Sequence, residues 1–254
     1  MNKIQIKVLN PEVIQDAEKM MVCAARMTQR GHKIKTLEDF EALYEKGYTE
    51  ITAMAMAKLP HPTIQKFAAI NIVVVGASRR FLAQITRHQN EVKFMSASLQ
   101  YSDYSGEAGF VVPYELLGTL AEIQYLEQCA WAMDTYKSMV AAGVNNDSAG
   151  YLAPQSLRNV LIISATPFQW KHMISQRICR RNTDETRYVL LRCWEELYKL
   201  SPILFNRSTT GPFCMQQGGC QEGKMSCNRP INKGMNPTHI LRMDFPKLFE
   251  EEKR

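Results

Sequence analysis

FAAINIVVVGASRRFLAQITRHQ, residues 67–89, is the stretch that decides the fold of this chain. Its first nine residues, 67–75, are rich in β-branched side chains, which predicts a well-buried strand that ends at Gly76. Ser78 is a favourable N-cap residue, so a helix is expected to follow over residues 79–88. A buried strand that leads directly into a capped helix indicates a fold in which helices pack against a sheet.

Helical patterns lie on both sides of this stretch. Residues 4–9, IQIKVL, alternate as a short strand does, whereas helices are expected at 11–30, 37–46, 114–142, 154–161 and 170–198. Residues 96–105 are expected to form a polar loop or an irregular strand. From about residue 202 the chain is expected to form a loop-rich tail. Together the patterns predict an α+β fold, with residues 1–254 forming a single domain.

Composition places the chain among ordinary globular proteins, with 45% hydrophobic and 22% charged residues. The net charge of +6 suits anionic ligands without requiring nucleic acid. The N-terminal sequence MNKIQIKVLN contains no apolar signal core, and the apolar stretch at 70–77 is too short to cross a bilayer. We therefore expect a cytoplasmic protein without a membrane partner, whose seven cysteines are reduced.

Three polar side chains gather toward the end of the helix expected at 79–88. Gln84, Arg87 and His88 stand at positions i, i+3 and i+4, so they would share one helical face. A guanidinium, an amide and an imidazole on one surface suit a phosphate or a polar heterocycle. The polar residues 98–101, Ser-Leu-Gln-Tyr, would line the rim of such a pocket. The alternative is a solvated helix end that complements the helix dipole, followed by a polar turn.

Arginine is concentrated at residues 177–187, where four arginines are accompanied by only two acidic residues. On a continuous helix, Arg177, Arg181 and Asp184 would share one face. This excess of positive charge favours an anionic ligand, and a helix held by salt bridges is the alternative. Arg158 stands beside apolar residues and says little by itself.

The cysteines form no recognisable metal motif. Cys214, Cys220 and Cys227 are separated by five and six residues, unlike the CxxC pairs of structural zinc sites, and His239 adds no regular spacing. We therefore expect no metal site. The other four cysteines are expected to be small core residues: Cys23, Cys129, Cys179 and Cys193. The sequence also lacks GxGxxG, P-loop, GxSxG and HExxH motifs, which argues against the common nucleotide-binding and hydrolase classes.

Four segments, in order along the chain, resemble the flavin-dependent thymidylate synthases. The family signature is RHR, then seven or eight residues, then Ser, usually followed by x-R-Y. Here it stands as Arg-His-Gln at 87–89 and Ser-Leu-Gln-Tyr at 98–101. Residues 177–187 fit the pattern R-L-x-x-x-A-Q-x-E-I-R, residues 157–161 fit A-R-x-V-L-P, and residues 76–79 look like G-x-S-R. The tail at 211–227 is similar to a tail in one branch of the family.

The resemblance implies a central, mostly antiparallel sheet flanked by helices, with active sites at the subunit interfaces of a homotetramer. It also implies reductive methylation of dUMP to dTMP. Methylenetetrahydrofolate would be the carbon donor, and FAD would be reduced by NADPH. The partners are then small molecules rather than nucleic acid.

The family match also assigns roles to residues of this chain. Arg187 is the candidate catalytic residue that stabilises charge on the uracil ring, and Ser98 would contact that ring. The resemblance assigns dUMP binding to Gln84, Arg87, Ser98, Gln100, Arg158 and Arg187. It assigns FAD binding to Arg87, His88, Gln89, Arg177 and Arg181, and the folate–flavin side to Tyr101.

Several positions depart from the family pattern. Gln89 and Gln100 stand where the signature has arginine, and Lys66-Phe67 stands where many members have Glu-His, with His61 as a nearby substitute. These departures leave open a related pyrimidine-nucleotide one-carbon transferase, for example one that makes a hydroxymethylated product. The alternative from another class is a basic nucleic-acid-binding protein, supported mainly by the arginine-rich segment.

Overall fold

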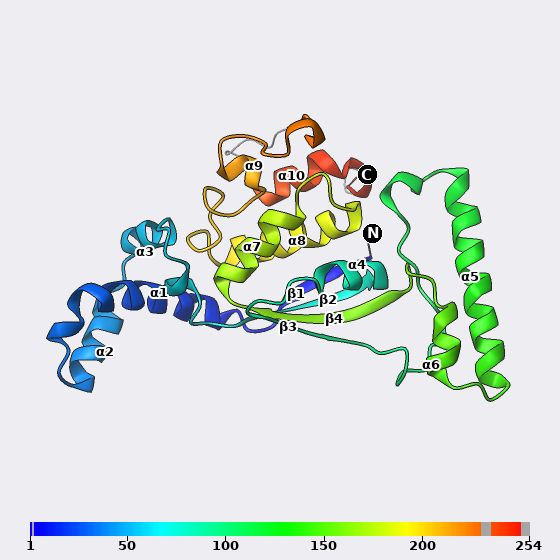
Figure 1. Cartoon of the computed structure of the whole chain (residues 1–254), viewed down its shortest axis with the longest axis horizontal. Helices are drawn as coiled ribbons and strands as arrows, with labels where there is room; N and C mark the ends of the chain where they lie inside the picture. The colour runs from blue at the N-terminus through cyan, green and yellow to red at the C-terminus, as the bar shows by residue number, and fades with distance from the viewer. Residues whose placement is uncertain (2, 230–234, 250–254) are drawn as a thin grey trace.

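A four-stranded antiparallel sheet forms the centre of the computed structural model, which describes residues 1, 3–229 and 235–249. The strands are β1 (Gln5–Val8), β2 (Ile70–Ser78), β3 (Val92–Ser96) and β4 (Arg158–Ala165). Their spatial order is β1-β2-β4-β3, and helices flank the sheet (Figure 1). The prediction of an α+β fold with a mostly antiparallel sheet is confirmed.

One face of the sheet is buried because side chains alternate along the two central strands. Helices α7 (Pro167–Arg177) and α8 (Asp184–Leu200) lie over the sheet (Figure 1). Trp170 of α7 donates its indole N–H to the carbonyl of Ile70, at 3.0 Å, which anchors the helix to β2. The buried face contains Ile70, Ile72, Val74, Leu161 and Ile163, whereas Val75, Met95, Val160 and Ile162 are exposed.

The junction between β2 and the next helix, α4 (Arg79–Ile85), differs in part from the prediction. The strand begins at residue 70 and does not end at Gly76, because Gly76 forms a bulge with a φ of 83° between two stretches of pairing with β4. The predicted cap is confirmed, since the Ser78 hydroxyl accepts from the Phe81 N–H at 3.1 Å. The helix is shorter than predicted and ends before Arg87 and His88.

The helix predicted at 154–161 is wrong, because the second half of this segment, residues 158–161, belongs to the central strand β4. Pro154 suggested a helix start, but the following residues alternate between buried and exposed positions, as a strand does. β4 pairs with β2 on one side and with β3 on the other. Pairing with two distant strands therefore outweighs the local helical signal.

The long, mostly helical segment predicted at 170–198 forms two helices, α7 and α8, separated by residues 178–183. The Asn182 side-chain amide donates to the carbonyls of Gln176 and Cys179, at 2.9 and 3.2 Å, and so satisfies the end of α7. The chain restarts at Thr183, whose ψ of 144° is extended. The shared helical face predicted for Arg177, Arg181 and Asp184 therefore does not form.

Two groups of helices lie at opposite ends of the sheet (Figure 1). At one end are α1 (Glu12–Arg30), α2 (Leu37–Lys46) and α3 (Glu50–Ala57), of which only α3 was not expected. At the other end α5 (Leu120–Ala141) and α6 (Asn146–Ala149) enclose a second, smaller core around Tyr136 and Leu157. α5 begins six residues later than predicted.

The described part of the tail contains the α-helices α9 (Phe213–Gln216) and α10 (Pro237–Asp244). α10 was not expected, and it packs on α8 through the buried Ile240 and Leu241. Short 3₁₀ helices lie at Gly31–Lys33, Pro62–Gln65, Tyr114–Leu116, Gly150–Leu152, Gly223–Met225 and Pro246–Leu248. Within the described residues, no helix is long and apolar enough to cross a membrane.

Replacing Gly76 with alanine is expected to destabilise the protein by about 1–3 kcal/mol, because a positive φ is costly for a residue with a Cβ. The new Cβ would also lie 3.2 Å from the Lys3 carbonyl oxygen and 3.0 Å from Nη1 of Arg158. Urea unfolding measures this loss. Gly31→Ala is the matched control, because its φ is −55° and its Cβ would meet nothing within 4 Å. Equal losses in the two variants would contradict this account of the bulge.

Candidate active site

Arg177, at the end of α7, is hydrogen-bonded to the segment at the end of α4 and just after it. We call this group, together with the nearby Arg87, the His88–Arg177 cluster: Gln84, Arg87, His88, Arg177 and Asn182. Arg177 Nε donates to His88 Nε2 at 2.8 Å, and Nη2 donates to the Gln84 carbonyl at 3.0 Å. Nη1 lies 3.4 Å from the amide oxygen of Asn182. Because His88 Nε2 accepts, the ring proton of neutral His88 is at Nδ1.

Burial determines the charge state of this cluster. It lowers the pKa of His88 to about 4, and the positive charge of Arg177 adds to the effect. Burial also lowers the pKa of Arg177, followed by the nearby charge of Arg87. In the described part of the chain, neither Arg87 nor Arg177 has a carboxylate partner. Two neighbouring cations beside a neutral imidazole form a site that attracts an anion.

A cavity of about 480 Å³ flanks the cluster and contains a group that the sequence analysis did not single out. Lys171 is buried there and donates to Oε1 of Gln65 at 2.8 Å, and burial lowers its pKa to about 7. His172 lines the same cavity, with its ring centroid 6.0 Å from that of His88. A lysine in the apolar run at 170–174 was the available signal, because lysine is seldom buried without a reason.

Arg158 lies in a second group, at the start of β4. Its Nη1 donates to the carbonyl of Gly76 at 2.8 Å, and its Nε to the carbonyl of Phe110 at 3.1 Å. Nearby, the Glu185 carboxylate accepts from the Ser78 N–H at 2.6 Å and from the Ser78 hydroxyl. Burial raises the pKa of Glu185 against the effect of these hydrogen bonds. The segment at 76–79 is thereby bonded to the first turn of α8.

A cavity of about 520 Å³ opens beside this second group, between the end of β2, the first turn of α8 and the start of α5. Its lining combines carboxylates, hydroxyls and phenol rings, among them Ser78, Tyr114, Tyr125, Asp184 and Glu185. A cavity of this size, mainly apolar with a few convergent polar groups, suits a small ligand.

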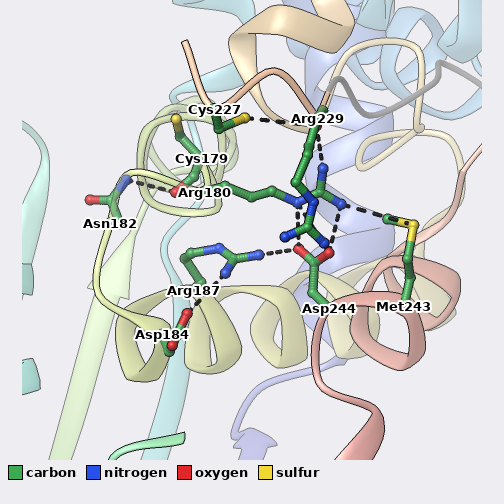
Figure 2. A network of polar contacts seen from close by, with 9 residues as sticks. All are labelled: Cys179, Arg180, Asn182, Asp184, Arg187, Cys227, Arg229, Met243 and Asp244. Carbon is green, nitrogen blue, oxygen red and sulfur yellow. Dashed lines mark hydrogen bonds and ion pairs between the residues drawn. The ribbon is translucent and has the colours of Figure 1, made fainter. Parts of the chain in front are cut away.

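Arg187 belongs to a third group and is 5% exposed. Its Nη1 donates to Asp184 at 3.0 Å, and its Nη2 donates to Asp244, the last residue of α10. Arg180 binds the same Asp244 carboxylate through Nε and Nη2 (Figure 2). Arg158, Arg177 and Arg187 therefore have separate sets of hydrogen-bond partners.

The remaining candidates lie on the surface. Gln89 and Gln100 are exposed, and Tyr101 is 82% exposed. Ser98 accepts a hydrogen bond from the Gln100 N–H at 3.1 Å, which makes a local turn. Among the described residues, no hydrogen bond or ion pair joins Ser98, Gln100 or Tyr101 to the arginines.

Arg181 and Arg177 line a further cavity, of about 900 Å³, between the α7–α8 loop and the tail. Arg181 forms an exposed ion pair with Glu222. Four cysteines line the same cavity: Cys179, Cys214, Cys220 and Cys227. The prediction that Cys179 is a core residue is wrong, because the chain leaves α7 just before it, whereas Cys23, Cys129 and Cys193 are buried as predicted. Within residues 1, 3–229 and 235–249, no three His, Cys, Asp or Glu side chains are arranged to hold a metal.

Residues 11–203 match the family model of the thymidylate synthase complementing protein. The chain belongs to this family. The matched region contains the His88–Arg177 cluster, Arg158, Glu185 and Arg187, and it ends before the tail that carries α9 and α10.

Curated relatives extend over most of the chain. A flavin-dependent thymidylate synthase of Thermococcus onnurineus is 27% identical over 196 residues, which are 74% of this chain and 78% of the relative. A second protein of that name, from Geobacter sulfurreducens, is 25% identical over 219 residues, covering 84% of this chain and 90% of the relative.

Two solved structures share the fold. A UMP/dUMP methylase, PolB from Streptomyces cacaoi, bound with 5-Br dUMP, has a TM-score of 0.65 at 18% identity and covers 82% of this chain and 95% of its own. Thymidylate synthase X from Helicobacter pylori, with FAD and dUMP, has a TM-score of 0.56 at 14% identity, with 80% and 97% covered. Both likenesses extend over about four fifths of the chain and concern its fold.

His88 is expected to stay neutral well below pH 6. Because its pKa falls from the ordinary 6.5 to about 4 on folding, unfolding takes up a proton between these values, and stability decreases as the pH falls from 6.5 to 4. Between pH 7 and pH 5 the His88 contribution is about 1–2 kcal/mol.

NMR titration of the histidine rings measures this pKa directly. Comparing the urea unfolding of wild type and His88→Gln at pH 7 and pH 5 measures the contribution to stability, which the variant should lack. A His88 ring signal that titrates near pH 6.5 would contradict the geometry of the His88–Arg177 cluster.

Proposed function

We propose that this chain converts dUMP to dTMP by reductive methylation, with methylenetetrahydrofolate as the carbon donor, FAD as the cofactor and NADPH as the reductant. Family membership supports the reaction type. The observation on which the proposal rests is the His88–Arg177 cluster, where a half-buried arginine with only neutral acceptors lies beside a second arginine.

The donor set of this cluster fits FAD. The pyrophosphate of FAD would supply the negative charge that pairs with Arg87 and Arg177, because a guanidinium can donate two parallel hydrogen bonds to phosphate oxygens. His88, Gln89 and Arg181 would complete the contacts, because His88 is hydrogen-bonded to Arg177, and Arg181 lines the cavity that Arg177 also lines. Reduced FAD, when bound, supplies the electrons for the reductive methylation.

The nucleotide is assigned to Gln84, Arg87, Ser98, Gln100, Arg158 and Arg187. C5 of uracil becomes nucleophilic only when charge builds on the ring carbonyls, and a fixed guanidinium stabilises that charge. Arg187 is suited to this role because its guanidinium is desolvated and held by carboxylates on two sides. Ser98 would orient the ring, without acting as a covalent nucleophile.

A homotetramer with sites between subunits would combine these residues with those of a second copy. Val75, Met95, Val160 and Ile162 leave the outer face of the sheet apolar and exposed, which is typical of an interaction surface. A second copy would bring its surface residues Ser98, Gln100 and Tyr101 to the arginines of the first. The assembly, the single-domain organisation of residues 1–254 and the cytoplasmic location are parts of the proposal.

The folate side differs from the family pattern. Lys66 pairs with Glu91 at 2.6 Å, and Phe67 is 59% exposed. Neither residue replaces the imidazole of the family pattern. Tyr101 and the nearby His61 are the candidates for this side, and both side chains are exposed. This departure supports a second candidate product, a hydroxymethylated nucleotide.

Anaerobic turnover of dUMP with methylenetetrahydrofolate, NADPH and FAD tests the function, with the product mass determined. We expect dTMP. A hydroxymethyl product would support the second candidate. No product from a yellow, flavin-loaded protein would reject both, and salt-dependent DNA binding by a colourless protein would support the nucleic-acid alternative.

Arg187→Ala and Arg177→Ala are expected to have different effects, the first on turnover at the nucleotide site and the second on flavin binding. Arg187→Ala should lower kcat by about 100-fold or more and leave the flavin content near that of the wild type. Arg177→Ala should instead lose most of the flavin, because it removes one of the two neighbouring cations and the donors of the guanidinium to the anion. Flavin absorbance per chain and kcat with added FAD measure these effects. Arg30→Ala, at the exposed end of α1, is the control. Equal loss of flavin in both arginine variants would contradict the assignment.

A further inference from the structure

Asp244 lies outside the family-matched residues 11–203, yet its carboxylate contacts the arginine of the last family motif. Its side chain is 2% exposed. Arg180 donates to it through Nε, at 3.1 Å to both oxygens, and through Nη2 at 2.6 Å. Arg187 donates to it through Nη2 (Figure 2). The tail helix α10 is thus bonded to the arginine-rich region of the sequence.

Burial makes this arrangement specific. The side chains of Arg180 and Arg187 are 7% and 6% exposed, so water does not compete for their donors. Charge-assisted hydrogen bonds are short and directional in such surroundings, and a buried charge without its partner is costly. Burial acts to lower the pKa of Arg180, but the hydrogen bonds to Asp244 raise it on balance. The three groups are therefore held in one geometry.

Arg187 is restrained on two further sides. Asp184 binds its Nη1 at 3.0 Å, and its guanidinium carbon lies 5.1 Å from the centre of the Phe245 ring. Its Nε is buried and has no hydrogen-bond partner in the described residues. A buried donor without an acceptor costs about 1–3 kcal/mol, and a carbonyl oxygen of a ligand would remove that cost. Asp184, bonded to Arg187, lines the 520 Å³ cavity.

We propose that Asp244 is a positioning residue for Arg187, so that the C-terminal helix α10 completes the nucleotide site. The inference rests on the proposed function, in which Arg187 meets a ring carbonyl of the pyrimidine. Asp244 and Asp184 engage the two terminal nitrogens of the guanidinium and leave the Nε–H for the ligand. Because Arg180 binds the same carboxylate, α10 stays docked while Arg187 keeps a fixed orientation.

The experiment compares Asp244→Asn with Arg180→Met in the full-length protein. Both variants break the buried pair between Arg180 and Asp244, so both should lose stability, but only Asp244→Asn removes the charge that orients Arg187. Thr238→Val is the control for docking of α10, because it breaks the hydrogen bond from Thr238 to Glu195, 2.6 Å long, on the exposed side of the helix.

Titration calorimetry with dUMP is the first measurement, because it needs no turnover. We expect the Kd for dUMP to rise about tenfold in Asp244→Asn and to change less than about threefold in the two other variants. Steady-state kinetics should show kcat lowered by about 10- to 100-fold in Asp244→Asn alone, as expected for a misplaced catalytic group. Thermal unfolding records the stability of each variant.

A second comparison covers the case in which Asp244→Asn does not fold. Compared with Asp244→Asn alone, the double variant Arg180→Met/Asp244→Asn no longer leaves the positive charge of Arg180 buried without its partner. Removing both partners of a buried pair costs less stability than removing one. Compared with Arg180→Met alone, it differs only in the carboxylate that Arg187 loses. The same rise in the Kd for dUMP is expected between these two proteins.

Two results would overturn the inference. One is unchanged dUMP affinity and kcat in both variants that carry Asp244→Asn. The other is an equal loss in Arg180→Met, which would mean that the ion network acts only through stability. If wild-type protein does not bind dUMP at all, the proposed function fails, and this outcome is distinct from a failure at Asp244.

Discussion

The hydrogen bonds between Glu185 and Ser78 connect the two parts of the chain on which the candidate site depends. Ser78 ends β2 and caps α4, and Glu185 is in the first turn of α8, 107 residues later. The carboxylate is buried, and the hydrogen bonds from Ser78 are the largest of the effects that offset its desolvation, ahead of the charges of the N-terminus and Arg158. Ser78 thus accepts a hydrogen bond from a backbone N–H at the start of α4 and donates hydrogen bonds to a side chain at the start of α8. This contact sets the position of Asp184 and Arg187 relative to the sheet.

From this junction the arginines diverge into three environments with different chemistry. Neutral acceptors surround Arg177, backbone carbonyls bind Arg158, and carboxylates bind Arg187. The charge of Glu185 acts on Arg158, whereas a second cation, Arg87, acts on Arg177, so the first environment is the one that attracts an anion. The other two hold a guanidinium in a fixed direction, which suits recognition of a neutral ring edge. Arginine therefore serves either to attract an anion or to present a fixed guanidinium, depending on which groups accept its hydrogen bonds.

Much of the local structure follows from short-range chemistry and was predictable. The spacing of apolar residues predicted α1, because this helix buries one side, which includes Ile14, Ala17 and Met21. Ser78 was identifiable as a cap because its side chain competes for a backbone N–H. β4 was not predictable, since the apolar run at 160–163 fits either a buried strand or a helix. Pairing with β2 and β3, which are distant in sequence, decided between them.

The sequence alone determined the family resemblance, the strand–cap–helix junction and the identity of the basic residues, because these depend on residue type and spacing over a few positions. Only the tertiary structure decided which residues pair. Arg177 is hydrogen-bonded to His88, 89 positions away in the sequence, and Arg187 is hydrogen-bonded to Asp244, 57 positions away. Such partners are chosen by burial, because a charge removed from water must be satisfied by whatever group the fold brings beside it. The spacing of residues along the chain does not predict which of them pair in this way.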